Sequence, residues 1–252
     1  MKKFEGFSAV GVIIGVVVVA LIGVAAYFII DGNNKATDFA HYDFNSVIEP
    51  TKDNGSIGDH VKGDPNAPVL IFEYADYQCP GCASINPRVN KLVEKLDGKL
   101  AVVYRSFLLS YHKNGTAAAS AAEAAGLQGY WKEYADKLFE EQDEWEYASA
   151  SERTELFNKY FEEVTNGMGD LDKFNNDMAS EAVSKKVNFD MGVGKRIGVS
   201  GTPAFYIDGE LIKWGEAGEI TINGKTLSWD SARSGEDFTE LLKDIVKAKL
   251  GE

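Results

Sequence analysis

Two cysteines are the residues of this chain whose type and spacing point most directly to chemistry. Cys79 and Cys82 are the only cysteines among the 252 residues, and Pro80 and Gly81 separate them. A thiolate is the nucleophile of thiol–disulfide exchange, and two neighbouring thiols can alternate between dithiol and disulfide. Because each thiol has only the other as an internal partner, the sequence predicts a redox-active Cys79–Cys82 pair.

The flanking sequence predicts that this pair lies where a strand ends and a helix begins. An apolar, β-prone run at 69–74 precedes it, a helical pattern at 83–96 follows, and a second β-prone run covers 100–108. This spacing predicts a parallel strand pair with a right-handed helical crossover. The helix N-terminus would lower the pKa of Cys79, the attacking thiolate, and leave the deeper Cys82 as the resolving thiol.

Neighbours of the two cysteines have expected roles of their own. Pro80 suits the first helical position, and Gly81 leaves the sulfurs open to a partner. Glu73, on the preceding strand, is either a proton acceptor for Cys82 or a partly exposed acid at the strand end. Asp76, in the loop between strand and helix, is expected to be solvated.

Composition and charge argue against two other kinds of site. The net charge of −13 leaves no basic stripe for phosphates, so we expect no nucleic-acid partner. A structural zinc ion takes four ligands, and the three histidines His41, His60 and His112 show no ligand spacing. We therefore expect neither a metal nor a bound cofactor.

The first 30 residues predict a transmembrane helix. Lys2 and Lys3 precede an apolar run from Phe7 to Ile30, which is long enough to span a bilayer core of about 30 Å. A cleaved signal peptide has a shorter apolar core of about 7–15 residues, so an uncleaved anchor is favoured. The lysines predict a cytoplasmic N-terminus and an extracytoplasmic domain on the cell membrane. With either an anchor or a signal, the cysteines would lie outside the reducing cytosol.

The remaining chain is predicted to be a linker followed by one domain. Residues 31–62 are polar and are interpreted as the linker, and residues 63–252 as the domain. Apolar residues such as Phe39, Phe44 and Ile48 make the segment too apolar for a pure tether, so part of it is expected to pack on the domain. Within the domain, helical periodicity dominates residues 113–197 and predicts four or five helices.

After this helical block, the sequence contains two turn signals. The dipeptides Asp208-Gly209 and Asn223-Gly224 predict two hairpins, and residues 234–250 form an amphipathic pattern typical of a final helix.

Three stretches carry a family resemblance. Residues 63–82 are similar to the active-site region of the DsbA-like thiol–disulfide oxidoreductases of the thioredoxin superfamily, in their bacterial membrane-anchored or secreted branch. Residues 111–131 resemble the start of that family's helical insertion, and residues 198–207 resemble its cis-proline loop.

The resemblance implies the fold class and completes the site. It implies an α/β, thioredoxin-like fold with a helical insertion at about 113–197, preceded by one N-terminal transmembrane helix. It also implies a cis peptide bond before Pro203, facing the cysteines, with Gly201, Thr202 and Pro203 as substrate-binding residues.

The expected function is that of an enzyme, a protein thiol–disulfide oxidoreductase. It would donate its Cys79–Cys82 disulfide to reduced secreted or surface proteins, and a membrane or small-molecule redox partner would reoxidise it. Two alternatives stay open: a reductase or isomerase of the same fold, and a non-catalytic, membrane-tethered substrate-binding module. A thiol-dependent peroxidase is disfavoured, because that chemistry needs no paired cysteines.

Overall fold

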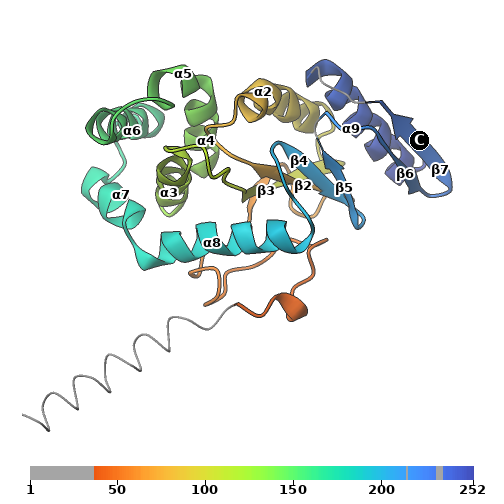
Figure 1. Cartoon of the computed structure of the whole chain (residues 1–252), viewed down its shortest axis with the longest axis horizontal. Helices are drawn as coiled ribbons and strands as arrows, with labels where there is room; N and C mark the ends of the chain where they lie inside the picture. Colours follow the sequence, from red (N-terminus) through yellow and green to blue (C-terminus); the bar gives the residue numbers. More distant parts are fainter. Residues whose placement is uncertain (1–36, 214, 231–234) are drawn as a thin grey trace, which may run out of the picture. The chain divides into compact units, whose positions relative to one another are not determined.

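The computed structural model describes residues 37–213, 215–230 and 235–252, of which His41–Glu252 form one compact unit (Figure 1). The predicted transmembrane helix, within residues 1–30, lies outside the described residues. Among the helices of the described part, none is long and apolar enough to cross a membrane.

The compact unit is built on a five-stranded mixed sheet with the spatial order β1-β3-β2-β4-β5. Its strands are β1 (His60–Lys62), β2 (Val69–Ala75), β3 (Leu100–Ser106), β4 (Ala204–Ile207) and β5 (Glu210–Lys213). Strands β2 and β3 are parallel and are joined by α2 (Pro80–Lys95), which confirms the predicted strand–helix–strand unit. Strand β4 pairs antiparallel with β2, with Phe205 opposite Glu73.

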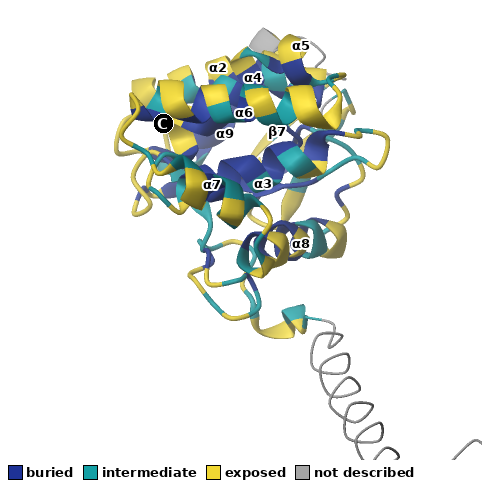
Figure 2. Cartoon of the chain, turned by 90° about the vertical axis from the view of Figure 1, so that its left-hand side faces the viewer, coloured by how far each residue is buried: buried dark blue, intermediate teal, exposed yellow. Residues whose placement is uncertain are grey.

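Six helices lie between β3 and β4 in the chain. They are α3 (Gly115–Gly126), α4 (Trp131–Glu140), α5 (Gln142–Trp145), α6 (Ala150–Thr165), α7 (Leu171–Met178) and α8 (Glu181–Arg196). These bounds confirm the predicted helical insertion, although it contains six helices where four or five were predicted. The alanine side chains of α3 are mostly buried, and because they are small they let neighbouring helices pack closely (Figure 2).

Helices α3 to α7 of the insertion stand at one side of the sheet, whereas other helices cover both of its faces. Figure 1 shows α8 running along one face and α2 lying over the other, beside the C-terminal helix α9 (Gly235–Leu250). The apolar core between the sheet and these last two helices includes Ile71, Val102, Val89 and Phe238. With both faces covered, β2 and β3 are almost entirely buried, as continuous apolar runs predict.

Two short hairpin turns lie where the sequence predicts them. The first joins β4 to β5, and the second joins β6 (Gly218–Ile222) to β7 (Lys225–Trp229) in a separate two-stranded sheet. Asn223 and Gly224 have φ values of 51° and 79°, the left-handed backbone that an Asn-Gly hairpin turn requires.

Part of the segment 31–62 packs on the domain as expected, but the predicted domain boundary at residue 63 is wrong. Strand β1 pairs antiparallel with β3, and Ile48 and Ile57 are buried, so the domain begins well before residue 63. The Asp59 carboxylate lies 2.7 Å from Arg105 and 3.2 Å from Lys186, and all three side chains are buried. The segment resembles a linker because it is polar. Some of its polar residues, such as Asp59, are here the partners of buried charges instead of being solvated.

Candidate active site

Cys79 lies at the boundary between the β2–α2 loop and the helix. It is the N-cap residue of α2, with φ −81° and ψ 120°, and Pro80 follows in the first turn as predicted. Its amide donates to the Asp76 carbonyl at 2.9 Å, which fixes the loop before the helix. Both cysteines are free thiols in this structure; Cys79 is 7% exposed and Cys82 is fully buried.

The loop before β4 lies against the cysteines. The Thr202–Pro203 peptide bond is cis, as the family pattern predicts, and the Cys79 thiol donates to the Thr202 carbonyl oxygen at 3.3 Å. A Cβ on Gly81 would stand 3.1 Å from Pro203 Cδ and 3.7 Å from Cys79 Sγ. Gly81 therefore permits the close approach of the proline loop to the helix, besides leaving the sulfurs uncovered. Gly201 borders open space, and no contact gives it a role.

The environment shifts the pKa values of the two thiols in opposite directions. A hydrogen bond from Cys82 lowers the pKa of Cys79 to about 6, with further lowering by Thr202 and by the N–H groups of Cys82 and Gly81, against the opposing effect of burial. The Thr202 hydroxyl has no hydrogen-bond partner when Cys79 is a thiol, so it is available to a Cys79 thiolate. Burial raises the pKa of Cys82 well above its ordinary value, and the neighbouring Cys79 raises it further.

Glu73 is a buried acid beneath the cysteines. It lies in the interior of β2 and is fully buried, so the alternative of a partly exposed strand-end acid is wrong. Neither carboxyl oxygen has a hydrogen-bond partner, and burial raises its pKa. The carboxyl acts on Cys82, whose pKa it helps to raise. Glu73 makes no hydrogen bond to Cys82 in this structure, so its predicted role as a proton acceptor for Cys82 stays a prediction.

Two charged residues next to Glu73 were not predicted from the sequence. Lys62, in β1, is buried, donates to Asn86 of α2 and lies 3.8 Å from Asp136 of α4. Lys62 lowers the pKa of Glu73 and Asp136 raises it, although burial remains the largest effect. Asp136 also accepts hydrogen bonds from Asn86 and Asn90, and these residues line a cavity of about 290 Å³. No local signal reveals this arrangement, because its members come from three separate elements.

Asp76 corrects another expectation. The structure buries this carboxylate, which was expected to be solvated. It accepts from the Gln78 amide at 2.9 Å, from the Leu109 amide at 2.8 Å and from His112 Nδ1 at 2.9 Å. It thus ties the cysteine loop to the start of the helical insertion.

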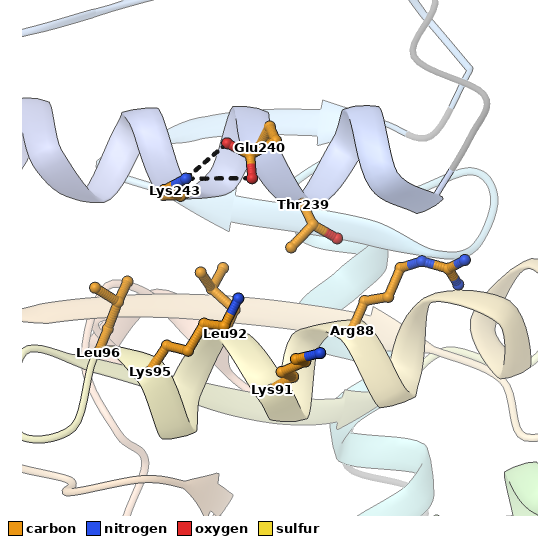
Figure 3. Close-up of a pocket in the computed structure, with 8 residues that line it drawn as sticks. All are labelled: Arg88, Lys91, Leu92, Lys95, Leu96, Thr239, Glu240 and Lys243. Carbon is orange, nitrogen blue, oxygen red and sulfur yellow. Dashed lines mark hydrogen bonds and ion pairs between the residues drawn. The ribbon is translucent and has the colours of Figure 1, made fainter.

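A larger hollow lies away from the cysteines, between α2 and α9 (Figure 3). Its volume is about 370 Å³, and its cations are Arg88, Lys91, Lys95 and Lys243, the last of which is paired with Glu240. It contains none of the predicted site residues. In the described part of the chain, no group of three or more His, Cys, Asp or Glu side chains could hold a metal ion.

A Cys-x-x-Cys pair that opens the helix of a strand–helix–strand unit, opposite a cis-proline, defines a thioredoxin-like fold and site. The comparison with protein families gives the same result. The model of a thioredoxin family matches residues 55–244, and the chain belongs to this family. The helical insertion between β3 and β4 is the one that the resemblance to the DsbA-like proteins implies.

Solved structures with this fold include several named DsbA-type or thioredoxin-like proteins. The α-DsbA1 protein of Wolbachia pipientis is 22% identical, with a TM-score of 0.55 over 76% of this chain and 92% of that one. BdbD from Bacillus subtilis is 19% identical, with a TM-score of 0.58 over 83% of this chain and 100% of that one. These likenesses support the fold.

Relatives in sequence include much larger proteins. The Na⁺/H⁺ antiporter NhaA 3 of Salinispora tropica is 34% identical over 154 residues, which are 60% of this chain and 22% of the antiporter. The antiporter NhaA of Herminiimonas arsenicoxydans is 31% identical over 171 residues, which are 68% of this chain and 25% of that protein. This chain thus matches about a quarter or less of the length of these relatives.

Proposed function

We propose that this chain is a thiol–disulfide oxidoreductase that introduces disulfides into reduced secreted or surface proteins. The observation that carries the proposal is the unequal environment of the two thiols. Cys79, near the surface, has its pKa lowered to about 6, whereas the pKa of the fully buried Cys82 is raised. Cys79 is therefore suited to react with a substrate thiol, and Cys82 to form and release the internal disulfide.

The exchange would proceed in two steps. A substrate thiolate attacks Cys79 Sγ of the Cys79–Cys82 disulfide, a substrate–Cys79 bond forms, and Cys82 leaves with the electron pair of the broken bond. Glu73, whose pKa is raised by burial, supplies the proton that Cys82 takes up. A second substrate thiolate then attacks the substrate sulfur of the mixed disulfide and releases Cys79 as a thiolate.

The lowered pKa of Cys79 favours the oxidising direction. A thiolate that is stable at neutral pH stabilises the dithiol form, which makes the disulfide a stronger oxidant. A redox partner, in the membrane or a small molecule, is needed to take the two electrons and restore the disulfide. We place the domain outside the cytosol, tethered by residues 1–30, because of their apolar length and flanking lysines.

The antiporter relatives supply no activity to this proposal, since the similarity covers only about a quarter or less of their length. A solved protein of Silicibacter pomeroyi, described as a thioredoxin-like oxidoreductase and 22% identical to this chain, is compatible with the proposed chemistry.

A redox titration tests the activity and its direction. We expect the full chain to oxidise a reduced, unfolded protein, with a reduction potential closer to about −120 mV than to about −270 mV. A potential near the lower value would favour the reductase alternative. Cys79→Ser should abolish exchange, and Met168→Ala, an exposed site, serves as the control. Unchanged oxidation by Cys79→Ser would support the non-catalytic module instead.

The anchor is tested separately. The full chain should stay with bacterial membranes after washing with high salt and alkali. Release of the full chain by either wash would refute the tether, whatever the result of the redox titration.

A further inference from the structure

Two strongly exposed tyrosines flank a pocket beside the cysteine loop. Tyr111 is 72% exposed and Tyr147 is 86% exposed, and both line the same pocket of about 310 Å³. Tyr111 follows β3, whereas Tyr147 follows α5. Large aromatic side chains exposed in one place are typical of an interaction surface.

The floor of this pocket includes the residue that precedes Cys79 in the chain. Gln78 lines the pocket together with Asn114, and Gln78 is bonded to Cys79 in the chain. The pocket therefore borders the cysteine loop, and each extended residue of a polypeptide that runs from the pocket toward the sulfur would span about 3.3–3.6 Å.

The two tyrosines are held by an ordered frame. The Tyr111 ring packs edge-on against His112, with 4.6 Å between ring centroids, and His112 is bound to the buried Asp76. On the other wall, the Asn114 side-chain amide donates to the carbonyl oxygens of Trp145, Glu146 and Ala148, which enclose Tyr147 in the chain. The separation of the two walls is thus set before any partner arrives.

The amide groups of the floor are already satisfied. Gln78 donates to the Glu146 carbonyl at 2.6 Å and accepts from the Asn114 amide at 2.7 Å. The Asn114 side-chain oxygen accepts from Arg153 at 2.7 Å. Two charged residues, Lys113 and Glu146, also line the pocket, and their opposite signs give the lining no net charge. With no unpaired amide in the floor and aromatic rings at both sides, the pocket favours an apolar or aromatic side chain over a charged one.

We infer that this tyrosine-flanked pocket binds an aromatic or large apolar side chain of the substrate polypeptide, a few residues from the cysteine that attacks Cys79. The inference rests on the proposed function and names a feature of its substrates. It explains why an exposed aromatic pair stands on the helical insertion, away from the cis-proline loop. Such side chains are accessible in unfolded proteins, which are the proteins that still carry reduced cysteines.

The test compares two dithiol peptides that differ at one position about three residues from the first cysteine, Trp in one and Ala in the other. We expect the oxidised full chain to react about three- to tenfold faster with the Trp peptide. The double variant Tyr111→Ala/Tyr147→Ala should bring the two rates to within about twofold. The double variant with Phe at both positions should keep the preference, because the rings remain. Met168→Ala, which removes another side chain that is 76% exposed, should leave the preference unchanged.

The inference and the proposed function fail in different ways. Equal rates with both peptides in the unaltered chain, or a Trp preference that survives the double alanine variant, would overturn the inference alone. A loss of preference in Met168→Ala would also overturn it, because the effect would then come from general surface hydrophobicity. Failure of the disulfide to react with either peptide and with dithiothreitol would refute the proposed function. Equal dithiothreitol rates for all variants are expected, since that reagent carries no side chain.

Discussion

The lowered pKa of Cys79 stabilises the dithiol form and thereby makes the Cys79–Cys82 disulfide a stronger oxidant. This pKa is lowered to about 6, against about 8.5 for an ordinary thiol. Between these values the unfolded chain binds more protons than the folded dithiol form, so the stability of the dithiol form rises with pH through this window and is lost as pH falls through about 6. At pH 7 the gain is about 1.4 kcal/mol, which corresponds to about 30 mV in a two-electron couple.

The perturbation that tests this gain is Thr202→Val, which keeps the shape of the side chain and removes the hydroxyl. The Thr202 side chain is one of the groups that lower the pKa of Cys79. A hydrogen bond to a charged group contributes about 1.5–3 kcal/mol, but because Cys82 is the larger cause here, we expect a rise of about one unit. At pH 7 the stabilisation then falls from about 1.4 to about 0.4 kcal/mol, and the disulfide becomes about 20 mV less oxidising.

Two measurements on the full chain check this prediction. The ultraviolet absorbance of the thiolate gives the pKa of Cys79, and equilibration with glutathione buffers between pH 5 and 9 gives the reduction potential. The potential should fall by about 59 mV per pH unit below the pKa and about 30 mV per unit above it, because one proton fewer accompanies the two electrons. Thr221→Val, in the exposed hairpin β6–β7, is the matched control. A break near pH 8 in the unaltered chain, or an unchanged break in Thr202→Val, would refute the reasoning.

Three further predictions concern the surroundings of the cysteines. Gly81→Ala places a methyl group 3.1 Å from Pro203 Cδ, so we expect exchange with protein substrates to slow about tenfold; an unchanged rate would contradict the proposed close approach. Because burial raises the pKa of Glu73, wild-type stability falls as pH rises from about 4.3 through the folded-state value. Glu73→Gln should therefore gain stability relative to wild type as pH rises through this window in denaturant titrations, while release of Cys82 from the disulfide becomes slower; a constant stability difference would count against the raised pKa. Asp59→Asn leaves two buried cations without their shared partner and should cost about 3–5 kcal/mol of unfolding free energy, whereas Glu240→Gln, at an exposed pair, should change it little. Similar losses in these last two variants would show that the buried cluster contributes no more than a surface pair.

Much of the fold could be predicted because its signals are local. The apolar run at 69–74, the helical pattern after it and the second β-prone run correspond to β2, α2 and β3. Turn chemistry at Asn223-Gly224 located the second hairpin, and helical periodicity delimited the insertion to within a few residues.

The errors concern polar residues, whose burial depends on distant partners. Asp76 was expected to be solvated and is buried because Leu109 and His112 reach it from beyond β3. Asp59 looked like part of a linker, but its carboxylate pairs with Lys186, which is 127 residues away. Polarity therefore predicted solvent exposure incorrectly at residues whose charge finds a buried partner in the fold.

The sequence by itself determined the reactive group, a Cys-x-x-Cys pair at a strand-to-helix junction. Residue type and short-range spacing are sufficient for that, because helix N-termini and turns form from neighbouring residues. Thr202-Pro203 was expected as its counterpart only from the family resemblance. Only the tertiary structure decided that Glu73 is buried without a hydrogen-bond partner, with Lys62 and Asp136 beside it, and that Gly81 packs against Pro203. The physical reason is that burial, charge pairing and close packing depend on which distant segments meet, and the pKa values that distinguish the two thiols follow from those encounters.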